Sequence, residues 1–218
     1  NRGLAYMSRE ELTAMALDRA ENGWQLAIHG NGDAAIDNQF DTCDVLGLVR
    51  GQEQDRARDL LRLADAAERM KEGGMDGIEI EAYGHLIDQF WSPLTNDLEG
   101  PYGGQSLDSR MKLLMDVLAG IRKRVGNDFI VGLRYTADEA EAGGITPQEG
   151  IEISKRLADS GMVDFLNVIR GHIDTDAALT DVIPVQGMRN APHLDFAGTI
   201  RREIGLVDRR HRCSVDHV

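Results

Sequence analysis

Proton-exchanging side chains follow a short stretch in which apolar and charged residues alternate. The stretch 77–81 predicts a β-strand, and Glu81, Tyr83 and His85 stand at or just after its end. An imidazole gains and loses a proton near neutral pH, so His85 could serve as a general acid or base. Each of the three residues could instead be a solvated loop residue with no part in chemistry.

A cation stands at the end of a second predicted strand. Arg134 lies near the end of the predicted strand 129–135, which is the clearest strand pattern of the chain. Because parallel strands present their carboxyl ends at one edge of a sheet, Arg134 places a fixed positive charge at that edge. The alternative is an ion pair between Arg134 and a loop carboxylate such as Asp138 or Glu139.

A third strand end carries another histidine. His172 and Asp174 follow the predicted strand 163–169. In a closed barrel the two side chains would face the same mouth as the other strand ends. We therefore expect them to be catalytic candidates, with a solvated loop position as the alternative for each.

His29 is a candidate metal ligand near the start of the chain. It ends the predicted buried strand 24–28 and precedes the glycine-rich turn 30–33. A neutral imidazole at such a place can bind a divalent metal such as Zn. A metal site needs three or four ligands, and no further ligands stand at suitable places in the sequence. The alternative is a hydrogen bond from His29 to neighbouring backbone.

The elements that position these residues alternate between strand and helix. Strands are expected near residues 24–28, 77–81, 129–135 and 163–169. Helix-length segments separate them, so the pattern predicts an α/β fold whose parallel sheet has right-handed crossovers. A complete eight-fold barrel needs about 250 residues. The chain therefore predicts a partial (β/α) TIM-barrel-like fold of about four to five βα units.

Local signals give several helix limits. Helices are expected over residues 55–71 and 107–125. Another should begin at Thr146, with Thr146 as cap, Pro147 at the first helical position and Glu149 closing a capping box. The polar stretch 92–105 predicts a long functional loop. A last helix is expected within residues 192–204, and residues 207–218 show no strand or helix pattern.

Composition narrows the class of protein. The chain has 218 residues and a net charge of −13, so it repels phosphate backbones and is not expected to bind nucleic acid. No apolar run reaches the ~20 residues of a membrane span. Two cysteines far apart suit a reducing, cytoplasmic compartment. Partners are expected to be a small-molecule substrate and, because an open half-barrel has exposed sheet edges, further copies of the chain.

Residues 1–46 resemble a stretch of the metal-dependent amidohydrolases. The resemblance rests on a strand that ends in a His-x-x-Gly-Asp-x-Ala-x-Asp pattern, formed here by His29, Gly32, Asp33, Ala35 and Asp37. It implies that His29 is a metal ligand and that residues 1–50 are a segment of a metal-dependent hydrolase. The other ligands of that family have no counterpart in the chain.

Residues from about 55 to 206 resemble the old-yellow-enzyme-like FMN oxidoreductases, and most closely the trimethylamine dehydrogenase and N-methylproline demethylase branch. The motifs are the runs 77–86, 89–96 and 102–104, followed by 109–111, 129–134 and 164–168. The resemblance implies an FMN cofactor contacted by Arg134. It also places Glu81, Tyr83 and His85 where the family has substrate-facing residues.

The two resemblances predict a division of the chain into segments 1–50, 51–206 and 207–218. They also lead to three candidate functions. The favoured one is an FMN-dependent oxidoreductase, or a fragment of one, acting on an amine or enone. The alternatives are a hydrolase that uses His29 and a catalytically silent chimeric barrel fragment. The family's first three strands, its phosphate-binding loop and its cysteine cluster for an iron–sulfur centre have no counterpart in this sequence.

Overall fold

The computed structural model describes residues 56–84, 86–173, 175–204 and 214–216, together with the single residues 11, 14, 18 and 22. The helices of the continuous ranges are α3 (Arg56–Glu72), α4 (Leu86–Trp91), α5 (Leu107–Val125), α6 (Pro147–Ser160), α7 (Asp176–Val182) and α8 (Leu194–Glu203). The strands are β1 (Gly77–Glu81), β2 (Ile130–Asp138), β3 (Phe165–Arg170) and β4 (Ser214–Asp216). The predicted strand 24–28 and the boundary near residue 50 lie outside the described residues.

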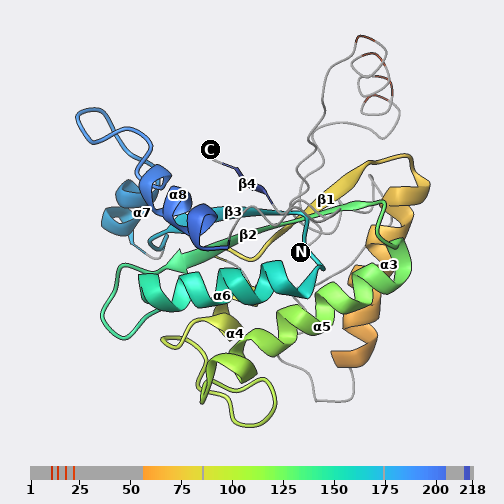
Figure 1. The fold of residues 1–218 in the computed structure, drawn as a ribbon, viewed down its shortest axis with the longest axis horizontal. Helices are drawn as coiled ribbons and strands as arrows, with labels where there is room; N and C mark the ends of the chain where they lie inside the picture. The colour runs from red at the N-terminus through yellow and green to blue at the C-terminus, as the bar shows by residue number, and fades with distance from the viewer. Residues whose placement is uncertain are drawn as a thin grey trace.

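The strands of the described residues form one parallel sheet in the order β1-β2-β3-β4 (Figure 1). Neighbouring strands in the sheet are also consecutive in the chain, so helices provide each described crossover, as parallel pairing requires. In the register of the sheet, Arg134 lies opposite both Glu81 and Asn167. The prediction of an α/β fold built from βα units is confirmed.

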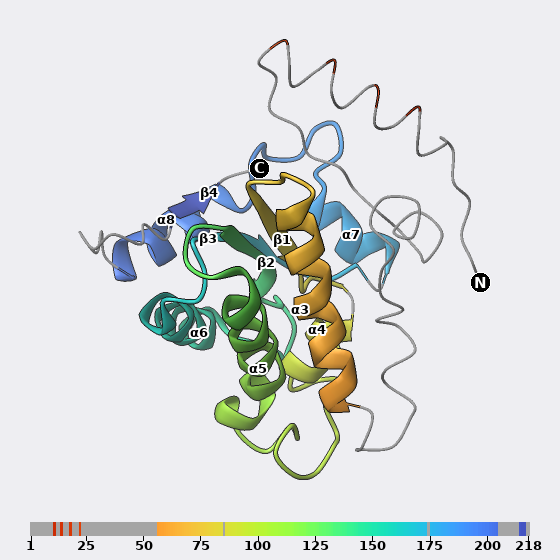
Figure 2. The ribbon, with the colours of Figure 1, turned by 90° about the vertical axis from the view of Figure 1, so that its right-hand side faces the viewer.

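Helices α3, α5 and α6 lie side by side along one face of the sheet (Figure 2). That face contributes Val131, Leu133, Tyr135 and Ala137 of β2 to the core, and each of them is fully buried. Because side chains alternate along a strand, Arg134 and Thr136 point to the opposite face. The hydrophobic core therefore fixes the direction in which the polar residues of β2 point.

The register of β2 and β3 shifts between Thr136 and Asp138. Such a bulge bends the strand and changes the direction of the side chains that follow it. It lies at the carboxyl end of β2, immediately before Glu139. The strict alternation of β2 therefore ends where the candidate site begins.

Local sequence signals account for the starts of two helices. Ser106 caps α5 by accepting a hydrogen bond from the Ser109 backbone N–H, and the Ser109 hydroxyl accepts one from the Ser106 backbone N–H. Thr146 caps α6 as predicted, with Pro147 in the first turn. The prediction that the Glu149 side chain closes a capping box with Thr146 is wrong, because the Glu149 carboxylate forms an ion pair with Arg110.

Several limits differ from the sequence prediction. Helices α4 and α7 were not expected, and both are shorter than two full turns. The expectation that residues 207–218 contain no strand is wrong, since β4 pairs in parallel with β3. The edge of β3 offers unpaired backbone donors and acceptors, which three residues can satisfy without any apolar pattern of their own.

Candidate functional site

Polar side chains gather along β2 from its middle onward, at the carboxyl end of β1, on the loops after β1, β2 and β3, and on the first turn of α4. We call this group the strand-end cluster; it comprises Glu81, Tyr83, Asp88, Arg134, Thr136, Glu139 and His172. Tyr83, Asp88, Thr136 and Glu139 are buried, while Glu81, Arg134 and His172 are half-buried. Because buried polar groups are costly unless satisfied, such a concentration of them is a candidate functional site.

Arg134 occupies the outer part of the cluster. Its Nη1 atom lies 3.5 Å from Glu81 Oε1, and its guanidinium carbon lies 5.5 Å from the centre of the Tyr83 ring. The Arg134 Nε atom is buried and has no hydrogen-bond partner among the described residues. The prediction that Arg134 stands at the end of its strand is wrong, because β2 runs on to Asp138. An ion pair and a cation–π contact hold Arg134 in the middle of β2, while its Nε donor has no partner among the described residues.

The ion pairs of this region differ from the expected alternative. Arg134 was expected to pair with Asp138 or Glu139 if it had no binding role. Asp138 instead pairs with Arg170, and Glu139 lies against His172. The two loop carboxylates are therefore engaged with other residues, and the carboxylate beside Arg134 is that of Glu81.

Glu139 and His172 form the inner part of the cluster. Glu139 Oε2 accepts a hydrogen bond of 2.6 Å from the Ile145 backbone. Glu139 Oε1 lies 3.2 Å from His172 Nε2, but neither atom has an aligned hydrogen-bond partner. The Glu139 side chain is completely buried, so this contact lies within the protein interior.

Asp88 adds a second buried carboxyl group to the inner part. One of its oxygens, Oδ2, accepts a hydrogen bond of 3.1 Å from the Gly84 backbone. Its other oxygen, Oδ1, is buried without a hydrogen-bond partner among the described residues, as is the Thr136 hydroxyl. Asp88 is thus anchored at one oxygen and available at the other.

Two backbone positions with positive φ shape the loops of the cluster. Gly84 has a φ of 69°, and a Cβ atom there would lie 2.6 Å from Ile173 Cδ1. Ala140 has a φ of 55°, and its N–H donates a 2.9 Å hydrogen bond to Asp138 Oδ1. A non-glycine residue rarely adopts this conformation, so the turn that directs Glu139 inward is held against local strain.

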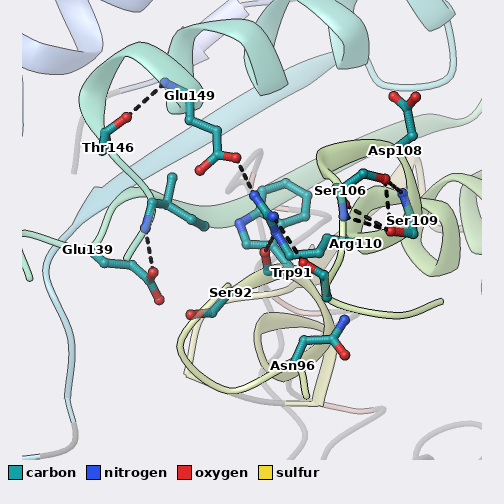
Figure 3. A network of polar contacts seen from close by, with 12 residues as sticks. Trp91, Ser92, Asn96, Ser106, Asp108, Ser109, Arg110, Glu139, Thr146 and Glu149 are labelled. Atoms are coloured by element: carbon teal, nitrogen blue, oxygen red, sulfur yellow. Dashed lines mark hydrogen bonds and ion pairs between the residues drawn. The ribbon is translucent and has the colours of Figure 1, made fainter. Parts of the chain in front are cut away.

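A polar network around Arg110 holds the helix that carries Asp88 (Figure 3). Arg110 is buried, its Nε donates to the Trp91 carbonyl over 2.9 Å, and its guanidinium pairs with Glu149. The Trp91 indole N–H in turn donates to the Thr136 carbonyl over 3.1 Å. The end of α4 is thereby tied to β2, α5 and α6, which fixes the place of Asp88 relative to the strands.

Burial changes the acid strength of two members of the cluster. Desolvation raises the pKa of Asp88 to about 6, and the Glu139 carboxylate adds to the rise, whereas the Gly84 N–H and His172 lower it. Desolvation also raises the pKa of Tyr83 to about 12, against the lowering effect of Arg134. Asp88 can therefore change its protonation near neutral pH, while Tyr83 stays a hydrogen-bond donor.

The structure brings together four of the predicted site residues: Glu81, Tyr83, Arg134 and His172. The predicted residues His85 and Asp174, and the predicted metal ligand His29, lie outside the described residues. Among the described residues, no group of three or more His, Cys, Asp or Glu side chains could hold a metal ion.

No sequence pattern indicates Asp88 as a site residue, because α4 is too short to be predicted and Asp88 lies on it. Glu139 had been considered only as a partner of Arg134, and Thr136 not at all. The alternation of β2 could have identified Thr136, since it shares a strand face with Arg134.

No helix in the described part of the chain is long and apolar enough to cross a membrane.

Comparison with known proteins identifies the class of this fold and site. Residues 54–180 match the model of the NADH:flavin oxidoreductase / NADH oxidase family. The chain belongs to this family, and FMN is the cofactor that the family indicates. The old yellow enzyme homologue of Zymomonas mobilis has the same fold, with a TM-score of 0.54 and 21% identity over 77% of this chain and 43% of that chain.

Two relatives are more similar in sequence. A probable N-methylproline demethylase of Rhizobium meliloti (strain 1021) is 72% identical over 138 residues, which cover 63% of this chain and 20% of the relative. The N,N-dimethylglycine/sarcosine dehydrogenase of Chromohalobacter salexigens is 41% identical over 144 residues, covering 66% of this chain and 21% of the relative. The chain thus spans about a fifth of the length of these relatives.

The matched residues begin after the segment that resembles the amidohydrolases. The family model starts at residue 54 and does not extend to His29. The resemblance of residues 1–46 therefore has no support from this match, and the division of the chain near residue 50 stays a prediction.

Proposed function

We propose that this chain forms part of the catalytic site of an FMN-dependent oxidoreductase that acts on a small amine. The observation that carries the proposal is the position of Arg134. Arg134 lies in the middle of β2, opposite Glu81 at the carboxyl end of β1, and its guanidinium is held by Glu81 and Tyr83, with a buried Nε donor that no described residue satisfies. A buried donor of this kind fits the anionic edge of a flavin ring, which would supply the missing acceptor.

FMN, when bound, supplies the hydride chemistry, and the residues of this chain supply charge and protons. Arg134 would stabilise negative charge on the ring through a fixed, always charged guanidinium. Glu81 holds the Arg134 side chain in place, because the two groups pair across neighbouring strands. Arg134, Glu81 and Tyr83 therefore act as one unit. The face of the Tyr83 ring stabilises the Arg134 guanidinium through a cation–π contact.

Proton handling falls to the remaining strand-end residues. Tyr83 keeps its phenolic proton at neutral pH, because its pKa is raised to about 12, so it would donate a hydrogen bond rather than act as a base. His172 lies at the same strand edge, with its imidazole against Glu139. We include His85 and Asp174 in the proposal by their places in the sequence.

The substrate class is proposed from the printed functions of the relatives. The two relatives described above are named for N-methylproline demethylation and for dimethylglycine or sarcosine dehydrogenation. Both names describe small N-methylated amines, which favours an amine over an enone. We further propose a homo-oligomer in a reducing, cytoplasmic compartment, from the sheet edges and the two cysteines.

Flavin binding by the purified full chain tests the proposal. We expect the chain to take up FMN and show the visible absorbance of an oxidised flavin. Arg134→Ala should weaken FMN binding roughly 10- to 100-fold, the effect of losing one charge-assisted hydrogen bond of about 1.5–3 kcal/mol. Arg189→Ala is the matched control, since Arg189 pairs with Asp195 on an exposed surface. A wild-type chain that shows no flavin absorbance after excess FMN has been removed by gel filtration would contradict the proposal.

A further inference from the structure

Four buried polar atoms in the inner part of the strand-end cluster lack hydrogen-bond partners among the described residues. They are Asp88 Oδ1, Thr136 Oγ1, Glu139 Oε1 and His172 Nε2. Native proteins leave very few buried polar atoms unpaired, and those that remain often have a functional reason. These four come from α4, β2 and the segments after β2 and β3, so the fold brings them together from separate parts of the chain.

The inner cluster contains two carboxyl groups and one imidazole in a buried environment. Asp88 is 9% exposed, and the side chain of Glu139 is 0% exposed. His172 Nε2 lies 3.2 Å from Glu139 Oε1, a hydrogen-bond distance without hydrogen-bond alignment. Two ionised carboxylates this deeply buried repel each other, and a proton on one of the three side chains relieves that repulsion.

Two contacts place Asp88 beside the same group. Asp88 Oδ2 accepts a hydrogen bond of 3.1 Å from the Gly84 backbone, and a Cβ atom on Gly84 would lie 2.6 Å from Cδ1 of Ile173, the residue after His172. Apart from burial, the Gly84 N–H, the Glu139 carboxylate and the His172 side chain act on the Asp88 carboxyl. Glu139 raises the pKa of Asp88 and His172 lowers it, so the state of each neighbour changes the proton affinity of Asp88.

The wider surroundings add two more titratable groups. Tyr83 lies beside Asp88 and remains protonated, with its pKa raised to about 12. Glu141 reaches within 4.0 Å of His172 Nε2 from the solvent side, with 56% of its side chain exposed. Glu141 therefore touches the imidazole without sharing the buried environment of the cluster.

We propose that Asp88, Glu139 and His172 form a proton-sharing group, in which Asp88 accepts a proton from a ligand bound at the strand-end cluster. The ligand's N–H or O–H bond breaks with its electron pair left on the ligand, and an O–H bond forms on Asp88. Glu139 and His172 act as positioning residues that set the proton affinity of Asp88. That a bound ligand donates the proton rests on the proposed function. The coupling among the three side chains is independent of the proposed function.

The titration of Asp88 in two variants of opposite effect tests this group. In the full chain labelled with carbon-13 at aspartate carboxyl groups, NMR should show one aspartate, lost in Asp88→Asn, with a pKa of about 6 instead of 3.8. Because Glu139 raises this pKa, Glu139→Gln should shift the Asp88 titration downward, toward 3.8. Because His172 lowers it, His172→Gln should shift the same titration upward.

Glu141→Gln is the matched control for both variants. It removes a carboxylate that faces the same imidazole, but from an exposed position, so the Asp88 titration should stay within error of the wild type. General loosening of the fold would re-expose Asp88 and move every variant toward 3.8. The opposite shifts of Glu139→Gln and His172→Gln therefore separate coupling from structural damage.

Two results would overturn the inference: an Asp88 that titrates like an exposed aspartate in the wild type, or variants at Glu139 and His172 that shift it no further than Glu141→Gln does. Neither measurement requires FMN. A chain that binds no FMN but shows the opposite shifts would contradict the proposed function and leave the proton-sharing group supported. A chain that binds FMN without those shifts would support the proposed function and contradict the proton-sharing group.

Discussion

At the scale of single residues, Arg110 is the cation on which the position of the site depends. It is buried between α4, the loop 92–105 and α6, and all of its partners are acceptors on those segments (Figure 3). Asn96 strengthens the same loop, because its amide donates to the carbonyls of Phe90 and Tyr102. The loop thus acts as a support beneath the strand-end cluster.

Arg110→Ala should lower the free energy of unfolding by about 3 kcal/mol. The substitution leaves the Glu149 carboxylate and the Trp91 carbonyl without their donor, and breaking a buried ion pair from one side costs this order of energy. Urea denaturation followed by circular dichroism measures the change. Arg110→Lys should restore less than half of the loss, since an ammonium cannot reproduce the planar fork of donors.

Arg189→Ala serves as control for Arg110. It removes the same side chain from an ion pair in which both partners are about 70% exposed. Exposed ion pairs contribute on the order of 0–1 kcal/mol, so the unfolding midpoint should barely move. Equal losses in Arg110→Ala and Arg189→Ala would show that burial of the guanidinium has no energetic consequence here.

The site residues that the sequence predicts are those on or just after strands with a clear pattern. Tyr83 follows the strand 77–81, which alternating apolar and charged residues mark, and Arg134 lies within the strand that the apolar run 129–135 marks. Asp88 and Glu139 have no such marker, since their importance depends on burial. Burial arises from contacts between segments far apart in the chain, and no local pattern encodes it.

At the scale of elements, the approach of α6 to β2 depends on a glycine. A Cβ atom on Gly150 would lie 1.8 Å from the Ala137 carbonyl oxygen, so the first turn of α6 packs directly on the strand backbone. Ala137 lies one residue before the end of β2, near the bulge that precedes Glu139. The close contact therefore fixes α6 against the strand end that carries the site.

Gly150→Ala should destabilise the fold by roughly 1–3 kcal/mol, the usual cost of overpacking a core. This outcome runs against helix propensity, by which alanine is favoured over glycine by ~1 kcal/mol. Thermal unfolding of the variant measures the difference.

Gly198→Ala is the matched control in α8. The nearest atom to a Cβ there is the end of the flexible Arg202 side chain, at 3.6 Å. With space available, helix propensity should dominate and stabilise the protein by ~0.5–1 kcal/mol. Stabilisation in both variants would show that α6 can move away from β2 without cost.

Element prediction succeeded where periodic patterns are long. The strand 77–81 and the helix 107–125 have the predicted limits, because alternation and a sustained apolar stripe define them. The short helices α4 and α7 are not predicted from the sequence, because one or two turns contain too few residues to show the helical spacing of apolar residues. Tertiary contacts stabilise them instead: the indole of Trp91 in α4 donates to the β2 backbone, and Val182 of α7 packs with Tyr83 and Ile169.

At the scale of the whole molecule, the sheet of the described residues has two edges. Strand β1 pairs only with β2, and β4 only with β3, among the residues that the structure describes. Their outer backbone groups are potential pairing surfaces, and a second copy of the chain offers the same groups. A parallel sheet normally continues or closes, which favours association.

We therefore predict a homodimer or larger assembly at micromolar concentration. Light scattering should give a mass of at least twice the 24.0 kDa of the chain. Each copy carries a net charge of −13, so the copies repel one another, and added salt should strengthen association by screening that repulsion. A monomer at every salt concentration would show that the sheet edges are not available for pairing, whereas an assembly that dissociates as salt is added would point to contacts between charged side chains instead of backbone pairing.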